Sequence, residues 1–144
     1  MTVAAILRHK GNKVTHVAPG VSTAEVVKTL AEQRIGAVLV MDEQRRILGI
    51  VSERDIITAM AAHGPSVLQQ PADQLMTRSV QTVTPETTVV EAMEMMTAGR
   101  FRHIPVLDDG VLVGIVSIGD VVKARIMQTE HEVDSLKAYV AGAA

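Results

Sequence analysis

Hydrophobic and polar positions alternate with two different periods along this chain, and the same order of periods occurs twice. Between Val26 and Ala31 the apolar residues follow a helical spacing, whereas Ala37–Met41 is a nearly continuous apolar run, typical of a strand buried on both faces. The first half therefore predicts a strand at Lys13–Val17, a helix from Ser22 that ends at Gly36, strands at Ala37–Met41 and Ile47–Val51 joined by a turn at Asp42–Arg46, and a helix at Glu53–His63.

The second half predicts the same elements in the same order. Each half opens its first helix with a capping-box sequence, Ser22–Glu25 and Thr88–Glu91, in which the glutamate is expected to reach back to the cap. The predicted elements are a strand at Gln81–Thr84, a helix from Thr88 to Gly99, strands at His103–Leu107 and Val111–Val116, and a helix from Gly119 to about Met127. The pattern thus predicts a mixed α/β (α+β) fold of two β-α-β-β-α halves.

The residues themselves repeat most clearly at one predicted strand-to-helix junction. Gly-Ile-Val-Ser-Glu-Arg-Asp at Gly49–Asp55 returns as Gly-Ile-Val-Ser-Ile-Gly-Asp at Gly114–Asp120. Two such copies predict two subdomains related by a pseudo-twofold axis and packed through their sheets, with clefts in related pairs.

The repeats leave three segments outside them. We expect an N-terminal helix in residues 1–12 (Val3–His9), a first domain at 13–65, a linker at 66–78 with one helical turn at Ala72–Met76, a second domain at 79–128, and a helical tail at 129–144. In the tail, Val133, Leu136 and Val140 share one side. An apolar stripe this short does not stabilise an isolated helix, so we expect it to pack against its own domain or against a second subunit.

Composition narrows the classes of function. The net charge of −2 gives no general attraction to nucleic acids or acidic membranes, and Phe101 and Tyr139 are the only aromatic residues, too few for base stacking. The chain has no cysteine and no run of roughly 18 apolar residues. We therefore expect a cytoplasmic protein without nucleic acid or membrane partners.

The repeated junction carries the candidate chemistry. Its serine (Ser52, Ser117) falls at a helix N-cap and its aspartate (Asp55, Asp120) three residues later. One interpretation is that the pair only forms a capping box. The other is that the aspartate holds two ribose hydroxyls, because the remaining helices use the longer glutamate for capping.

Two basic residues stand at the entry of the buried strand in the second half. Arg102 and His103 are either a solvated strand end or partners for a phosphate. The matching positions of the first half are Gly36 and Ala37, so the two sites should be unequal, with the phosphate-competent one in the second half.

Catalytic and metal sites are not expected. The chain has no G-x-G-x-x-G, no phosphate-binding G-x-x-x-x-G-K-S/T and no G-x-S-x-G motif, and no pair of nucleophile and base can be assembled. Its histidines are scattered, at His9, His16, His63, His103 and His131. We therefore expect no enzyme activity, no bound metal and no catalytic cofactor.

Together these motifs resemble a tandem pair of CBS domains (cystathionine β-synthase domains), the Bateman module. The resemblance covers Lys13 to Met127 and rests on Val-x-Pro before each capped helix, on Arg102–Val106, and on both Gly-Ile-Val-Ser-x-x-Asp junctions. The chain looks like a free-standing module of this kind.

The resemblance implies an adenosine ligand (AMP, ADP, ATP, NAD or S-adenosylmethionine) in clefts between the two sheets. By position, Asp120 and Asp55 would hold ribose hydroxyls, Ser117 and Ser52 would lie at the ribose or phosphate, Arg102 and His103 would take the phosphate, and Thr82, Thr84, Val17 and Ala18 would lie near the base. Such modules form flat homodimers. The expected function is a regulatory adenine-nucleotide sensor acting through a homodimer or a partner protein; the alternative is a structural interaction module with no physiological nucleotide.

Overall fold

The computed structural model describes residues 1–143, which form two compact units. Unit 2 is the continuous segment Val14–Val80, whereas unit 1 combines Met1–Lys13 with the chain from Gln81 onward. The N-terminal helix therefore belongs with the second half of the sequence.

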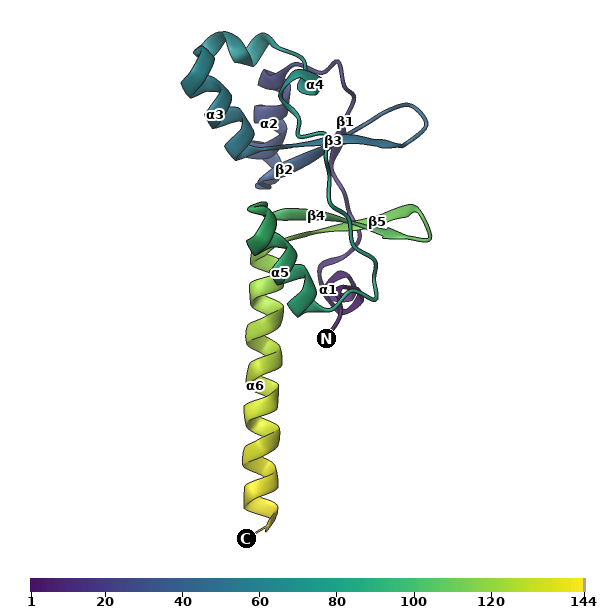
Figure 1. Ribbon diagram of the computed structural model, residues 1–144, viewed down its shortest axis with the longest axis vertical. Helices are drawn as coiled ribbons and strands as arrows, with labels where there is room; N and C mark the ends of the chain where they lie inside the picture. The colour runs from purple at the N-terminus through teal and green to yellow at the C-terminus, as the bar shows by residue number, and fades with distance from the viewer. Residues whose placement is uncertain (144) are drawn as a thin grey trace. The chain divides into compact units, whose positions relative to one another are not determined.

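Unit 2 is built around a three-stranded sheet in the order β1-β2-β3, with β1 parallel and β3 antiparallel to β2 (Figure 1). All of β2 is buried, which confirms the prediction for this apolar run. Val26 and Leu30 of the first helix and Ile56 of the second close the core over the sheet. The elements are β1 (His16–Val17), α2 (Thr23–Gln33), β2 (Ala37–Met41), β3 (Ile47–Ser52), α3 (Glu53–His63), a 3-10 helix η1 (Pro65–Gln69) and α4 (Ala72–Leu75).

Unit 1 has a two-stranded antiparallel hairpin, and its core is formed by residues from both ends of the chain. Val3 and Ile6 from the N-terminal helix lie in one cluster with Met96, Ile104 and Val121. The elements are α1 (Val3–Lys10), α5 (Val89–Gly99), β4 (His103–Asp108), β5 (Val111–Ser117) and α6 (Ile118–Ala143).

The prediction of a strand at Gln81–Thr84 is wrong. Only Val83 pairs with β4, through a single parallel bridge to Val106. The segment leaves the sheet at the next residue, because the Thr84 N–H donates to Thr87 Oγ1 (3.1 Å) instead of to a strand.

The predicted end of the first helix at Gly36 is wrong, whereas the predicted end of its counterpart in the second half, at Gly99, is confirmed. Both α2 and α5 are capped by an arginine in the left-handed conformation, Arg34 (φ 55°) and Arg100 (φ 56°). The Arg34 N–H still donates to Leu30 O, so the turn closes before Gly36 is reached. Gly99 is the last residue of α5, and a Cβ on it would collide with the Phe101 ring, so this glycine allows the ring to pack.

Helix α6 is continuous from Ile118 to Ala143, so the predicted tail is part of the last helix. Figure 1 shows it running past α5, and from Thr129 to Gly142 every side chain is exposed. The expectation that Val133, Leu136 and Val140 rest on their own domain is therefore wrong for the part of the chain that is described. Within residues 1–143, none of the helices combines the length and apolarity needed to cross a bilayer.

The two units repeat more than the sequence indicates, because α1 and α4 occupy equivalent places. The Ala4 N–H donates to Pro85 O (2.9 Å) in unit 1, and the Asp73 N–H donates to Pro19 O (3.1 Å) in unit 2. Each unit is thus completed by a helix that precedes the other half in the sequence.

Candidate functional site

The junction between β5 and α6 holds the Ser117–Asp120 pair in unit 1. The Ser117 N–H donates to Asp120 Oδ2 (2.8 Å), and the Asp120 N–H donates to Ser117 Oγ (3.2 Å). These reciprocal bonds are a capping box, so the capping interpretation of this aspartate is correct. Neither bond uses Oδ1, and a carboxylate has about four acceptor positions, so capping leaves acceptor capacity.

Lys10 brings a positive charge to the same carboxylate. Its ammonium lies 2.7 Å from Asp120 Oδ2 and donates to Ile115 O at 2.8 Å. Burial alone would raise the pKa of Asp120, but the hydrogen bonds from Lys10 and the Ser117 amide, with the Lys10 charge, lower it below its ordinary value of 3.8. Asp120 is therefore a firmly ionised acceptor beside a fixed cation.

Arg102 and His103 lie next to this junction. The Ile118 N–H, at the start of α6, donates to Arg102 O (2.8 Å), and His103 is the β4 residue paired with Ser117. The Arg102 side chain is exposed, and that of His103 is half-buried. The fold thus brings both basic residues to the strand end where Asp120 lies.

Thr82 and Thr84 flank Val83 and are both exposed. Because Val83 runs parallel to β4 and is bridged to Val106, Thr82 lies nearer than Thr84 to the end of β4 that carries His103. Both threonines are therefore in the same unit as Asp120, on the segment that bridges to β4.

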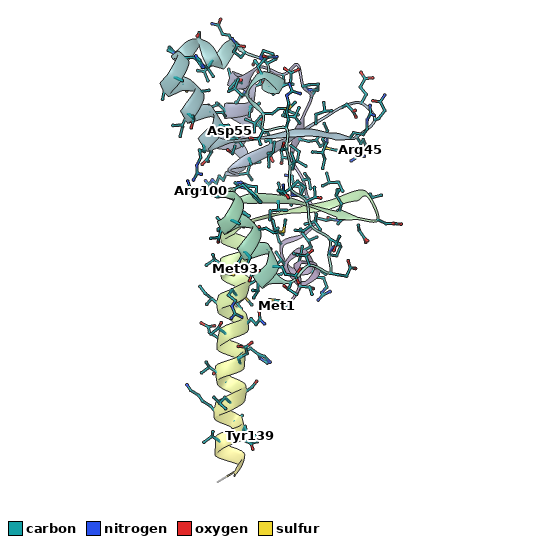
Figure 2. The ribbon with its side chains drawn as sticks, viewed as in Figure 1. Met1, Arg45, Asp55, Met93, Arg100 and Tyr139 are labelled. Atoms are coloured by element: carbon teal, nitrogen blue, oxygen red, sulfur yellow. The ribbon has the colours of Figure 1, made fainter. Side chains whose placement is uncertain are left out.

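Unit 2 repeats the junction between β3 and α3. The Ser52 N–H donates to Asp55 Oδ2 (2.8 Å), and the Asp55 N–H donates to Ser52 Oγ (3.2 Å). The Thr77 hydroxyl lies 3.5 Å from Asp55 Oδ1, on the oxygen that capping leaves unused. Figure 2 labels Asp55 at the start of α3. Asp55 thus has a hydroxyl beside its Oδ1, whereas Asp120 has an ammonium at its Oδ2.

The residues around the first-half junction differ in charge from those in unit 1. The Glu53 N–H donates to Gly36 O (3.0 Å), the same bond that joins Ile118 to Arg102, so a glycine stands where unit 1 has an arginine. Ala37 is paired with Ser52 and so matches His103. Glu53, at the start of α3, is followed by Arg54 and corresponds to Ile118 of unit 1. The two junctions therefore also differ in charge at the first residue of the helix.

The two predicted apolar contacts of the first half lie on and after β1. Val17 is half-buried and pairs in parallel with Val40, whereas Ala18 is exposed and its carbonyl accepts from the Val21 N–H (3.2 Å). Both precede the turn into α2, and Val17 lies on the same sheet as Ser52.

Unit 2 also has a cavity of about 530 Å³ between α3, η1 and α4. Asp55, His63 and Gln70 are among the residues that line it, so the cavity borders the first-half junction.

The length argument that favoured a ligand role for the aspartates is wrong. At Ser22 and Thr88 the cap accepts from the Glu25 and Glu91 N–H, but within residues 1–143 neither glutamate closes the box. The shorter aspartates do close it. A ligand role for Asp120 must therefore rest on its surroundings and on relatives.

Sequence reasoning missed Lys10. Its contact with Asp120 joins residues 110 positions apart, and the N-terminal helix was assigned to neither half. The signal in the sequence was weak: a basic last turn, Arg8-His9-Lys10, on a short helix. No group of three or more His, Asp or Glu side chains suited to a metal ion occurs in the described part of the chain.

Comparison with known proteins also finds the repeat. The family model for the CBS domain matches residues 3–62 and again 72–127. The chain belongs to the CBS domain family. Its mixed helices and small sheets agree with the solved CBS domain pairs, which confirms the predicted fold class.

Several relatives place the chain within the family. It is 39 % identical over 122 residues to the mitochondrial CBS domain-containing protein CBSX3 of Arabidopsis thaliana, covering 82 % of this chain and 59 % of that one. The CBS-domain protein ATU1752 of Agrobacterium tumefaciens is 47 % identical, with a TM-score of 0.84 over 86 % of this chain and 92 % of that one. The protein PAE2072 of Pyrobaculum aerophilum, solved with AMP, is 29 % identical, with a TM-score of 0.73 over 83 % and 89 % of the two chains.

Proposed function

We propose that this chain is a regulatory module that binds an adenosine nucleotide, with its principal site at the β5–α6 junction of unit 1. Asp120 would accept from the ribose hydroxyls, Ser117 would lie at the ribose or phosphate, and Arg102 and His103 would take the phosphate. AMP is the ligand we favour, with ADP, ATP and NAD in the same class. The bound state would be reported through a homodimer or a regulated protein partner.

The observation that carries this proposal is the pairing of an ionised acceptor with cations at one strand end. Asp120 keeps Oδ1 outside its capping box, and Lys10 lies 2.7 Å from its other oxygen. Arg102 is tied by its carbonyl to the first turn of α6, so its guanidinium starts from the same strand end as Asp120. A nucleotide joins a diol to a phosphate, so it matches both halves of this chemistry.

Relatives with bound ligands support the same class of ligand. Besides PAE2072, the family member CBSX2 was solved with AMP, and the domain pair of protein MJ0100 with 5′-methylthioadenosine and S-adenosyl-L-methionine. These ligands share an adenosine and differ in the charge of the group at its 5′ position. The cations around Asp120 favour a phosphorylated member over an uncharged thioether or a cationic sulfonium.

A second candidate function is a structural interaction module without a physiological nucleotide. The observation in its favour is that Asp55 and Asp120 each complete a capping box with the serine three residues before, which gives each aspartate a role with no ligand.

Titration of the purified chain separates the two candidates. We expect heat of binding and a rise in melting temperature with AMP, and a weaker response to adenosine, which lacks the phosphate. A ligand at 100 times its dissociation constant stabilises the folded state by about 2.7 kcal/mol, which is easily detected. If AMP, ADP, ATP and NAD all leave the melting temperature unchanged at millimolar concentration, the nucleotide proposal is wrong and the interaction module stands.

A further inference from the structure

Helix α6 carries a largely apolar stripe that none of the described residues of its own unit covers. The members recur at alternating spacings of four and three residues, and all are exposed: Val122, Ile126, Thr129, Val133, Leu136 and Val140. We call this set the α6 stripe. Leu136 and Val140 are 63 % and 59 % exposed, far more than single apolar residues in a packed helix.

The stripe is separate from the face by which α6 packs into unit 1. Val121 and Ala124 are buried in the core, whereas Val122 and Ile126, on the same turns, are exposed. Figure 2 labels Tyr139 on the last part of the helix, where no other element of unit 1 lies beside it. The stripe therefore begins on the body of the unit and continues without a break along the projecting helix.

The spacing and the residue types are those of a two-stranded coiled coil. In heptad terms Ile126, Val133 and Val140 occupy the a positions and Leu136 a d position. β-branched residues at a with leucine at d favour parallel dimers. Thr129, the polar d residue, donates its hydroxyl to Arg125 O (3.0 Å), so it would bring no unsatisfied donor into an interface.

Charges beside the stripe select the partner and its direction. In a parallel, in-register pair the g residue of one helix faces the e residue five positions later in the other. Arg125 then faces Glu130 of the second copy, and Glu132 faces Lys137 of the second copy. Both pairs are attractive, which argues that the occupant of the stripe is the same helix from another molecule.

The antiparallel alternative is disfavoured by the same residues. The antiparallel alignment that superposes the two stripes brings each e residue against an e residue and each g against a g. Glu130 and Glu132 would then each face their own copy, and Lys123 would face Lys137. Every one of these pairs is repulsive.

We propose that α6 self-associates, over Val122–Val140, into a parallel, in-register, two-stranded coiled coil between two copies of this chain. The inference deepens the homodimer named under the proposed function and is independent of any nucleotide. It also explains why an exposed helix of this length retains a regular apolar stripe.

A matched pair of substitutions tests the interface. Leu136→Glu puts a carboxylate into the stripe, whereas Ala138→Glu adds the same charge to an exposed position on the opposite side of the helix. We expect sedimentation velocity over a concentration series to show a dimer for the unmodified chain. The dimer dissociation constant should rise at least about tenfold in L136E, since two leucines leave the apolar interface, and less than about twofold in A138E.

Charge exchange and cross-linking test the register. E132K should weaken the dimer, and E132K combined with K137E should restore it, because the exchanged pair is again attractive. The chain has no cysteine, so T129C supplies a single thiol, which should form an interchain disulfide in a parallel, in-register pair.

Each readout can overturn the proposal. A chain that remains monomeric throughout the series, or a dimer equally affected by L136E and A138E, would show that α6 does not self-associate. A T129C dimer that does not cross-link would rule out the parallel register. So would an E132K variant that dimerises as strongly as the unmodified chain. AMP binding enters none of these measurements, so this proposal and the nucleotide proposal can fail separately.

Discussion

The two strand-to-helix junctions share a motif and a backbone but not an electrostatic setting. At both, the serine N–H and the aspartate close the same capping box, with N–H to Oδ2 distances of 2.8 Å. The two aspartates differ in the side chain that contacts them. Lys10 of α1 contacts Asp120, whereas Thr77, which follows α4, contacts Asp55. The repeated motif therefore sets the geometry, and the helix that completes each unit sets the charge.

The largest expected effect concerns the two aspartates. Asp120→Ala should remove most of the stabilisation that AMP gives, with an affinity loss of roughly 100-fold, because hydrogen bonds to a charged acceptor contribute about 1.5–3 kcal/mol each. Asp55→Ala should change AMP affinity far less. Calorimetric titration of both variants measures this difference.

Asp55→Ala is also the matched control, since each substitution removes one capping box of the same geometry. The serine remains the N-cap in each variant, so the cost of the lost bond from its N–H, about 1.5–3 kcal/mol for a bond to a charged acceptor, should be similar in both. Asp120→Ala loses the ion pair with Lys10 in addition. Equal losses of AMP affinity would refute the inequality of the two junctions.

A second comparison uses Gly49 in β3 and Gly114 in β5, the glycines that open the two copies of Gly-Ile-Val-Ser. A Cβ on Gly49 would lie 2.8 Å from the Thr77 carbonyl and 2.6 Å from Met76 Sδ, whereas a Cβ on Gly114 would meet only the Leu7 side chain, at 2.6 Å. A side chain can turn aside and a hydrogen-bonded backbone cannot. Gly49→Ala should therefore lower the free energy of unfolding by about 2–3 kcal/mol and Gly114→Ala by about 1 kcal/mol, measured by urea denaturation.

A double substitution sharpens that result. In the Gly114→Ala background, Leu7→Ala should cost less than it does alone, because the shorter side chain relieves the contact. Strictly additive losses would show that Leu7 is not what limits the space at Gly114.

The third expectation concerns acid stability. Because the pKa of Asp120 is lowered in the folded chain, its ionised carboxylate stabilises the fold above pH 3.8, and this contribution is lost as the pH falls below 3.8 through the folded-state pKa. Lys10→Met should raise that pKa and cost no more than about 1 kcal/mol at neutral pH, as expected for a partly exposed ion pair. A carboxyl NMR titration gives the pKa, and Lys10→Arg should leave it low.

The smallest expected effect is on ligand discrimination. A charge some 5–10 Å from a phosphate in water contributes roughly 0.4–0.8 kcal/mol, so Lys10→Met should lower the ratio of AMP affinity to adenosine affinity by about two- to fourfold. The ratio isolates the charge, because both ligands carry the same ribose. An unchanged ratio would mean that Lys10 serves only the fold.

Local patterns of apolar residues predicted both a helix and a buried strand correctly. Helix α3 spans Glu53–His63 as its periodicity indicated, and β2 is buried throughout as its apolar run indicated. Prediction was wrong where a neighbouring group competed for the backbone: Thr87 takes the Thr84 N–H, and Arg34 closes the helix turn before Gly36.

The candidate site was predictable only in part. The junction residues Ser117 and Asp120 stand out because they repeat, and their box follows from their spacing. Lys10 could not be placed, because its contact depends on α1 crossing into the unit formed by the second half. The ligand roles of these residues remain predictions that the titrations test.

The division of α1 from the rest of its unit has a consequence for how the chain is made. Unit 2 is one uninterrupted segment, so it can close as soon as Val80 has left the ribosome. Val3 and Ile6 cannot be buried in their core until Val116 and Val121 have been synthesised, since those residues complete it. Helix α1 therefore packs into its core only after most of the second half has been made, which joins residues far apart in the sequence.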